Sequence, residues 1–428
     1  MSRALKLTVL FACLLLVPSV AKAQGHMLHG VGPINSAMGG AGTALPEDSL
    51  NALTFNPALI TDVQGNQISF TTEFFKDGIN IRTTLGSLVG DAHPSNQLGV
   101  IPAFGWMLRD PHKKMALAFG LIGLAGFRTD YPADSSSILF APPPTGFGRI
   151  YTSYQETKIP IAFAWEVTPK LSIGVSANLY QGLFAVAPLP YNVFDLDAAS
   201  NRYYPEAGSV SEAWAMAAQF GFVYRASPTM SVGASLTTPQ NFSTYKWNSS
   251  NANPASTQYG QPRTLTFDLD GPMIVSFGTG LKPNAKTKIA IDGMFTKYSG
   301  VNGFGSPGGI VAGIVYPFGW RNIWTFKTGI QREMTDKLTV RAGYNYSQMP
   351  IRKEVVLTAT GAPATFQHHI CGGLELKMFP FLSAEVSAYY VPRQHAVGPF
   401  PDINNVNQGS IDESNTITSA LIGFNFHF

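Results

Sequence analysis

Apolar residues recur at every second position through most of this chain, beginning near residue 66. In one such run, single polar or small residues separate Leu171, Ile173, Val175, Ala177 and Leu179. This alternation is typical of β-strands with one apolar face. The runs exceed the roughly 9 to 11 residues that a tilted strand needs to cross a bilayer. The pattern therefore predicts membrane-spanning strands.

Fourteen such runs follow one another, and they predict an all-β fold, a closed antiparallel transmembrane β-barrel of fourteen strands. We expect strands at 67–82, 97–109, 113–128, 155–168, 170–186, 211–226, 229–248, 263–282, 285–298, 322–333, 336–348, 365–378, 381–395 and 414–428. Short connections alternate with long ones at 83–96, 129–154, 187–210, 249–262, 299–321, 349–364 and 396–413. Bacterial barrels have such short periplasmic turns and longer outer loops. Closure leaves no backbone group unpaired in lipid.

Aromatic residues alternate at the end of the last predicted strand, at Phe424, Phe426 and Phe428. We expect these side chains to face lipid and to form the signal that the barrel-insertion machinery reads. The alternative is a soluble β-sandwich that ends in an aromatic strand. A charged fraction of only 13% fits that alternative almost as well, but the seven alternations of short and long connections do not.

The N-terminus has the pattern of a signal peptide, expected at residues 1–23. Arg3 and Lys6 precede an apolar stretch at 7–17, and Ala21-Lys22-Ala23 fits a cleavage site. Cleavage removes three of the 29 lysines and arginines and none of the 26 acids, so the charges then balance. This balance excludes a broad nucleic-acid surface. Cys371 is left alone, which excludes an intrachain disulfide.

Residues 24–65 lack sustained alternation and are rich in glycine and alanine. They are too apolar for a flexible linker. We expect a compact N-terminal hatch inside the lumen, followed by the barrel at 66–428. An ordered strap beneath the barrel is the alternative.

At this point the sequence resembles the FadL-type family of outer-membrane long-chain fatty acid transporters, which includes importers of aromatic hydrocarbons. The resemblance rests on Gly30-Val31-Gly32, Met38-Gly39-Gly40-Ala41, Asp48, Asn56-Pro57-Ala58-Leu59, Trp324 to Ile330, Arg341 to Ser347 and Phe428. It implies passive uptake of hydrophobic molecules, which are captured at outer loops and released sideways through a kinked third strand.

The resemblance also implies roles for particular residues. Asn56, Pro57 and Ala58 occupy the hatch motif, and Gly123 and Gly126 are candidates for the kink, since glycine inside a strand permits bulges. Packing alone explains these two glycines equally well. Substrate capture at the outer loops would involve Leu189, Tyr191, Val193, Phe194, Leu196 and Phe140. Packing between the loops is the alternative for these apolar residues.

Fatty-acid members of the family hold the carboxylate with basic side chains in the pocket. Here the fifth strand has no arginine or lysine between residues 178 and 185. Alternation directs Lys327 and Arg341 inward as candidate substrate ligands. It does the same for Asp292, Glu375, Lys377 and Glu385, so the charges could instead pair across the lumen. A neutral aromatic or aliphatic hydrocarbon therefore stays open beside a fatty acid.

No motif of an enzyme or a cofactor site is found. The G-x-S-x-G, P-loop and H-E-x-x-H patterns are absent, and the adjacent His368 and His369 point to opposite faces of a strand. We expect a monomeric channel without cofactor or metal in the bacterial outer membrane. Its expected partners are a hydrophobic small molecule, outer-membrane lipid, lipopolysaccharide and the barrel-assembly machinery. The alternatives are a general diffusion porin and a barrel enzyme such as a phospholipase.

Overall fold

The computed structural model describes residues 25–63, 65–95, 98–110, 112–192, 194–311, 314–401 and 406–428. The predicted signal peptide and Val193 lie outside these ranges. Within them, no helix is both long and apolar enough to cross a bilayer.

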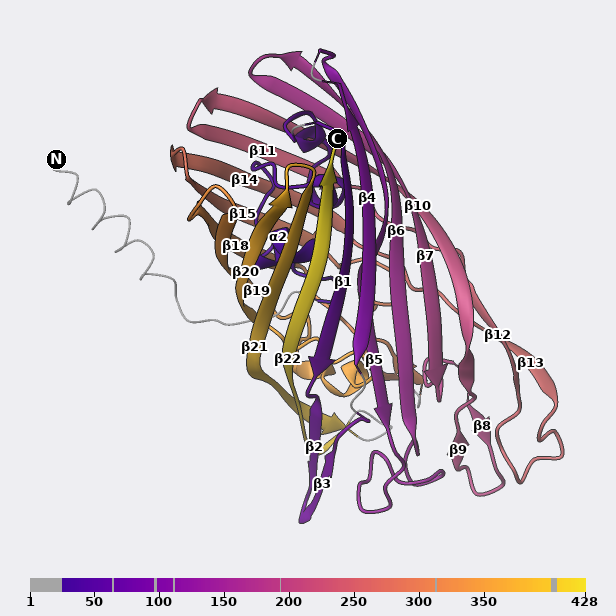
Figure 1. Cartoon of the computed structure of the whole chain (residues 1–428). Helices are drawn as coiled ribbons and strands as arrows, with labels where there is room; N and C mark the ends of the chain where they lie inside the picture. The colour runs from indigo at the N-terminus through magenta and orange to yellow at the C-terminus, as the bar shows by residue number, and fades with distance from the viewer. Residues whose placement is uncertain are drawn as a thin grey trace.

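Sixteen strands form one antiparallel sheet, and all of them except β2 and β3 make up a closed barrel (Figure 1). The barrel strands are β1 (Gln67–Asp77), β4 (Gly99–Arg109), β5 (Met115–Tyr131), β6 (Ile150–Thr168), β7 (Leu171–Ala187), β10 (Ala207–Ser227), β11 (Met230–Thr237), β14 (Met273–Asn284), β15 (Thr287–Lys297), β18 (Ile323–Glu333), β19 (Leu338–Ser347), β20 (His368–Phe379), β21 (Leu382–Pro401) and β22 (Asn407–His427). Pairing of β1 with β22 closes the ring. The predicted fourteen-stranded barrel is confirmed.

Two predicted strands are shorter in the barrel than expected. The predicted strand 229–248 leaves the wall after Thr237, because Pro239 has no N–H to donate to the ladder. Its continuation, β12 (Tyr245–Ser250), pairs with β13 (Pro262–Phe267) as a separate hairpin. The first part of the predicted strand 263–282 belongs to this hairpin. Both strands therefore contribute to an outer loop as well as to the wall.

Further hairpins extend the long-loop end of the barrel, opposite the C-terminus in Figure 1. They are formed by β2 (Asn80–Leu85) with β3 (Leu88–Ala92), β8 (Asp195–Leu196) with β9 (Arg202–Tyr203), and β16 (Gly309–Val311) with β17 (Ile314–Tyr316). Two short 3-10 helices, η2 (Lys353–Val355) and η3 (Leu357–Ala359), lie in the loop before β20. The short turns and the C-terminus share the opposite end, which the pattern of short and long connections predicts to be periplasmic.

Side chains alternate between the two faces of the wall. On β5, Leu117, Phe119 and Leu121 are exposed on the outside, whereas Ala116 and Ala118 are buried on the inside. The three terminal aromatics also face outward, with Phe424, Phe426 and Phe428 exposed by 39%, 36% and 62%. The outer face is thus apolar, and small inner residues leave room for a filled lumen.

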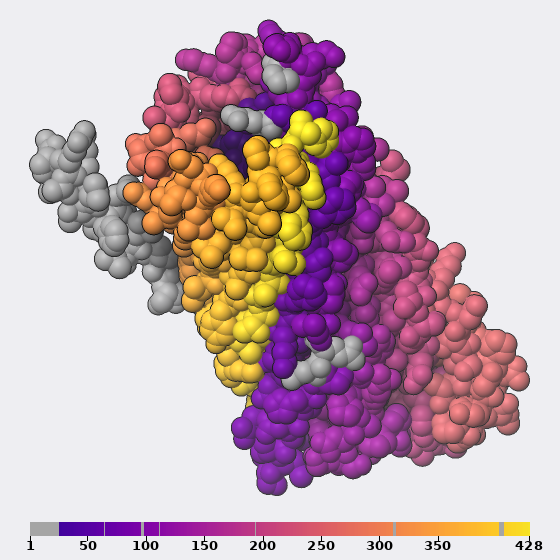
Figure 2. Space-filling view, in the orientation of Figure 1, coloured from indigo at the N-terminus to yellow at the C-terminus, as the bar shows by residue number. Residues whose placement is uncertain are grey.

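The lumen holds the N-terminal segment, which contains α2 (Gly32–Ala37), α3 (Ser49–Phe55) and the 3-10 helix η1 (Pro57–Thr61). Asp48 caps α3, and Asn56 caps η1. The hatch approaches the wall closely at glycines, since a Cβ on Gly343 would lie 2.2 Å from the Gly39 nitrogen. Figure 2 shows the indigo hatch set into the hollowed periplasmic end. A hatch in the lumen is confirmed, rather than a strap beneath the barrel.

Candidate functional site

The barrel wall parts between β4 and β5. Their pairs run from Arg109 with Ala116 to Ala103 with Ile122. The described residues show no β4–β5 pairing beyond that last pair. From Gly99 to Pro102, β4 pairs with β1, and from Gly123 to Tyr131, β5 pairs with β6. Beyond the last pair, the facing edges of β4 and β5 have no partner strand in the described wall until the N–H of Ser95 donates to the carbonyl oxygen of Asp130 at 3.0 Å.

A change of register in β5 lies where the pairing ends. The register with β6 shifts between Gly123 and Ala125, so that Leu124 is an extra residue. Before the shift the even-numbered residues of β5 are buried, whereas after it the odd-numbered Thr129 and Tyr131 are buried. An extra residue of this kind bends a strand. The pairing of β5 with β4 ends next to this extra residue.

The predicted kink residues Gly123 and Gly126 lie on either side of this shift. A Cβ on Gly123 would lie 2.4 Å from Cγ2 of Ile101, and a Cβ on Gly126 would lie 2.8 Å from the carbonyl oxygen of Tyr154. A larger residue at position 123 would consequently fill the space between β4 and β5.

The N-terminal segment pairs with β5 at the register shift. The Leu28 N–H donates to the carbonyl oxygen of Leu124 at 3.1 Å, and the Gly126 N–H donates to that of His26 at 3.2 Å. Met27 and Ala125 form the bridge between these two bonds. The hatch thus satisfies backbone groups that β4 leaves unpaired.

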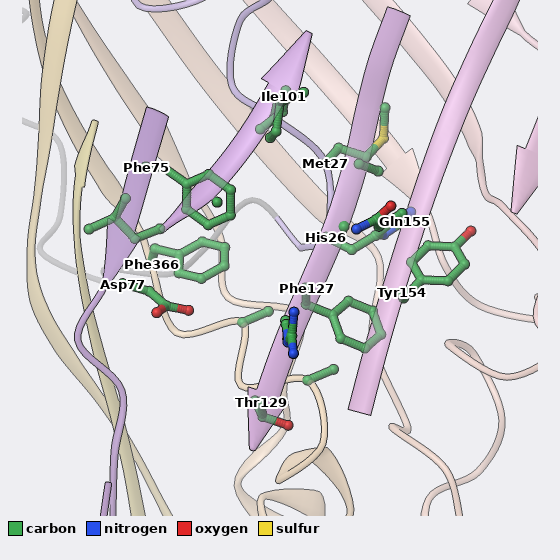
Figure 3. Close-up of a pocket in the computed structure, with 18 of the residues that line it drawn as sticks. His26, Met27, Phe75, Asp77, Ile101, Phe127, Thr129, Tyr154, Gln155 and Phe366 are labelled. Carbon is green, nitrogen blue, oxygen red and sulfur yellow. The ribbon is translucent and has the colours of Figure 1, made fainter. Parts of the chain in front are cut away.

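A cavity of about 300 Å³ adjoins the wall opening. Its lining includes Leu98, just before β4, and Val100 on β4, which are exposed by 64% and 55%, and the buried His369. Figure 3 shows Phe75, Ile101 and Phe366 on one side of the cavity, with Phe127 and Tyr154 on the other. The cavity therefore extends from the lumen to the opening.

Aromatic rings cover the inner end of this cavity. The ring centroids of His26 and Phe304 are 4.3 Å apart in a stacked arrangement, and those of Phe304 and Trp320 are 4.6 Å apart. Nδ1 of His26 lies 3.1 Å from the hydroxyl of Tyr298. Aromatic rings stack favourably or meet edge to face at such distances. A flat apolar ligand suits this lining.

Among the described residues, no buried lysine or arginine lines the cavity. Arg128 is the one lysine or arginine among its described lining residues, and its exposed guanidinium lies 5.7 Å from the ring of Tyr151. Burial lowers the pKa of His29 to about 3, so its imidazole is uncharged. Glu156 lines the cavity as well, and it accepts a 2.8 Å hydrogen bond from the Tyr154 hydroxyl.

Of the inward charges that alternation predicted, Lys327 and Asp292 bind the hatch, and others pair with neighbouring side chains of the wall. Lys327 donates to the carbonyl oxygen of His29 at 3.2 Å, and Asp292 accepts from the N–H groups of Gly42 and Thr43, each at 2.7 Å. Arg341 pairs with Glu375 at 2.5 Å on the neighbouring strand. Glu385 accepts from Asn425 at 2.8 Å, whereas Lys377 is exposed. Lys327 and Arg341 are not among the residues lining the cavity.

The hatch motif forms a further anchor to the wall. The Asn56 amide donates to the carbonyl oxygens of Thr43 and Phe222, at 2.7 and 3.1 Å, and its oxygen accepts from the N–H of Ala58 at 3.1 Å. A Cβ on Gly221 would lie 2.0 Å from this oxygen. Pro57 begins η1, where its missing N–H costs nothing.

The predicted capture residues of the outer loops make contacts with one another and with neighbouring loops. Leu189 and Phe140 are fully buried, and Tyr191 stacks on Phe267 at 5.2 Å. Phe194 contacts Tyr204 at 5.7 Å, whereas Leu196 stays 53% exposed. Loop packing thus accounts for most of this apolar surface.

The alternation of strands gave no signal for the cavity residues His26 and Trp320, because both lie outside strands.

Comparisons with known proteins agree with this architecture. Residues 14–357 match the model of a family described as outer membrane protein transport protein (OMPP1/FadL/TodX). The toluene transporter TodX of P. putida has 18% identity and a TM-score of 0.71, covering 94% of this chain and 99% of its own. A Pseudomonas aeruginosa FadL homologue has 15% identity and a TM-score of 0.72, with coverages of 95% and 100%. The CymD monoaromatic hydrocarbon channel has 16% identity and a TM-score of 0.66, with coverages of 94% and 98%. These likenesses show a shared fold, and no curated protein matches the sequence.

Proposed function

The chain belongs to the outer membrane protein transport protein family (OMPP1/FadL/TodX), and on this premise we propose how it moves its substrate. It is an outer-membrane channel for hydrophobic compounds and not an enzyme. In our proposal, a hydrophobic molecule enters from the outer loops, occupies the cavity beside β5, and leaves passively through the gap between β4 and β5 into the membrane.

The observation that carries this proposal is the position of the cavity. It is lined by β4 residues 99–102 and by β5 residues from Gly123 onward, which lie just beyond the last pair of the two strands, Ala103 with Ile122. A molecule in the cavity reaches the lipid without passing the hatch. The route keeps apolar surface away from water, which is worth about 25 cal/mol per Å². A dry cavity of about 150 Å³ is enough for benzene, so this one suits a small aromatic molecule.

The two alternative functions find less support. A general diffusion porin requires an open aqueous lumen, whereas here the buried hatch bonds to Lys327 and Asp292 on the wall. A barrel phospholipase requires a catalytic constellation, and the family is one of transport proteins. Swelling of liposomes in sugars would support the porin.

We also propose the remaining assignments of the chain. Residues 1–23 form a cleaved signal peptide, 24–65 the hatch and 66–428 the barrel. The outward Phe424, Phe426 and Phe428 are read by the assembly machinery, and the protein works as a monomer beside lipopolysaccharide. Leu196, with its exposed side chain, is the strongest remaining candidate for capture at the outer loops.

Obstruction of the gap tests the route. In Gly123→Val, the new Cβ would lie 2.4 Å from Cγ2 of Ile101, so the valine side chain fills the gap between the strands. We therefore expect uptake of radiolabelled toluene by whole cells to fall at least fivefold. Gly372→Val is the matched control, because the nearest atom to its Cβ would be 3.8 Å away. A difference in gel mobility between heated and unheated samples checks that both variants form a folded barrel.

Folded Gly123→Val with unchanged uptake would exclude the lateral route. A loss of uptake in both variants would point to a general effect of valine in the wall, and would count against the route as well.

A further inference from the structure

A second cavity, smaller than the one beside β5, lies among the outer loops. Its volume is about 50 Å³. The side chains around it are mostly apolar, and they include Leu139, Phe147, Ile150, Val186, Tyr191 and Leu357. They come from the loop between β5 and β6, the outer ends of β6 and β7, and the loops after β7 and before β20. We call this space the outer cavity and the cavity beside β5 the inner cavity.

One segment of chain, residues 357–364 in the loop before β20, separates the two cavities. Four of its first five residues, ending with Gly361, line the outer cavity, and the next three, Ala362 to Ala364, line the inner one. The wall beneath the segment repeats this division. Thr129 of β5 lines the inner cavity, at the bottom of the view in Figure 3, and its pairing partner Thr152 on β6 lines the outer one. The cavities are therefore only one residue apart at two places.

The segment is bonded mainly to itself. Small residues make up most of it, and every residue from 358 to 364 is buried. Two of its alanine N–H groups donate to carbonyl oxygens within the segment, at 2.7 and 2.8 Å. Toward the wall, the hydroxyl of Thr129 donates to the carbonyl oxygen of Gly361 at 3.4 Å, which is long for a bond between two oxygens. Thr360 also lies near the carboxyl group of Glu413 on β22. The segment thus has firm internal turns and few hydrogen bonds to the wall.

We propose that residues 357–364 form a gate, which moves aside to let a small apolar molecule pass from the outer cavity into the inner one. The inference rests on the proposed function and adds the step that fills the inner cavity. The outer cavity, at about 50 Å³, is smaller than the roughly 150 Å³ that holds benzene. An aromatic ring therefore fits there only when the segment moves. Such a movement keeps the internal turns and breaks few bonds to the wall.

A disulfide between the segment and the wall tests the gate. A Cβ on Gly361 would lie 3.7 Å from the Cβ of Thr152, a usual separation for two cysteines in a disulfide. The double variant Thr152→Cys/Gly361→Cys therefore ties the segment to β6 when it is oxidised. We expect whole cells with the oxidised variant to take up radiolabelled toluene about tenfold more slowly than cells with the unaltered protein. Reduction should restore uptake to within twofold.

The double variant Ala187→Cys/Gly208→Cys is the matched control. A Cβ on Gly208 would lie 3.4 Å from the Cβ of Ala187, so this pair also permits a disulfide close to the usual distance. It joins β7 to β10 at their outer ends, and neither residue lines the inner or the outer cavity. We expect oxidation of the control to change uptake less than twofold. Mass spectrometry of proteolytic fragments confirms that each disulfide has formed.

Thr129→Val provides a second measurement that needs no disulfide. It removes the hydroxyl that bonds to Gly361, and we expect the amides of residues 357–364 to exchange hydrogen about two- to fivefold faster. Uptake of toluene should rise in the same direction. Thr71→Val is the control, because its hydroxyl donates to the carbonyl oxygen of Ile422 at 3.0 Å, on another part of the wall. Exchange in the segment should stay unchanged in that variant.

Undiminished uptake by the oxidised Thr152→Cys/Gly361→Cys variant would overturn the gate and leave the channel function intact. A similar loss in the oxidised control pair would assign the effect to stiffened loops in general, and would overturn the gate as well. Faster exchange in Thr129→Val without faster uptake would count against it too. If the unaltered protein gives no toluene uptake above that of cells without it, the proposed function fails together with this inference.

Discussion

Leu28 and Leu124 are joined by a 3.1 Å hydrogen bond from the N–H of Leu28 to the carbonyl oxygen of Leu124. Leu28 belongs to the hatch, and Leu124 is the extra residue at which β5 changes register. This bond therefore links the hatch to the register shift in the wall. Whatever moves one of them removes a hydrogen bond from the other.

Leu28→Pro should loosen this contact, because proline has no N–H to donate. We expect the amide of Gly126, which donates to the neighbouring His26, to exchange its hydrogen about tenfold faster. Hydrogen–deuterium exchange of the peptide spanning 123–127 measures this rate. Leu28→Ala keeps the N–H and serves as the control. Equal protection of Gly126 in both variants would show that the bond does not hold the segment.

Asn56→Ala should weaken the hatch without opening the barrel. It removes two donated bonds and one accepted bond within the hatch and to Phe222, and we expect the free energy of local hatch unfolding to fall by about 2 to 3 kcal/mol. Protease cleavage of the hatch in increasing urea measures this change. The exposed Asn248 gives the control Asn248→Ala. A hatch that stays equally resistant would refute the anchoring role.

The stability of the hatch should fall as pH rises. Burial, with the nearby Asp48, raises the pKa of Glu47 to about 8 from an ordinary value of 4.5. Between these values the folded hatch holds a proton that the unfolded chain has lost, so the free energy of unfolding decreases by up to about 1.4 kcal/mol per pH unit. Urea-dependent proteolysis at pH 5.5 and 8 measures the slope.

Glu47→Gln should flatten that slope, because the amide does not titrate. Asp336→Asn, in an exposed turn, should leave it unchanged. The same slope in the protein and in Glu47→Gln would assign the pH dependence to another group.

Phe428→Ala should affect assembly more than stability. The backbone of Phe428 exchanges hydrogen bonds with Asn66 at 3.1 and 3.2 Å, and these do not depend on the side chain, which faces outward. We expect the folded fraction in cell membranes to fall severalfold, whereas the purified variant should unfold within about 0.5 kcal/mol of the parent. Phe379→Ala, also exposed on the wall near the periplasmic end, is the control. A similar decrease in both variants would argue against a terminal signal.

The sequence by itself determined the barrel and its strand number. Successive side chains of a strand point alternately to lipid and to the lumen, so alternation in the sequence shows which face each residue occupies. This information is contained in neighbouring residues of the strand itself. It placed Phe424, Phe426 and Phe428 outward and Lys327 and Arg341 inward, as found. It failed at Thr237, where the same alternation continues from the wall into an outer hairpin.

The tertiary structure alone decided where the wall parts and what lines the cavity. The end of β4–β5 pairing after Ala103 and Ile122 depends on the bulge and on the hatch behind it, neither of which shows in a periodic pattern. His26, Trp320, His369 and Asn415 line the same cavity although they come from distant segments. Alternation predicted that the Lys327 side chain points inward. It could not predict the hydrogen-bond partner of that side chain, which is the carbonyl oxygen of His29 in the hatch. Such contacts arise from close packing between separate parts of the chain, and no local spacing encodes them.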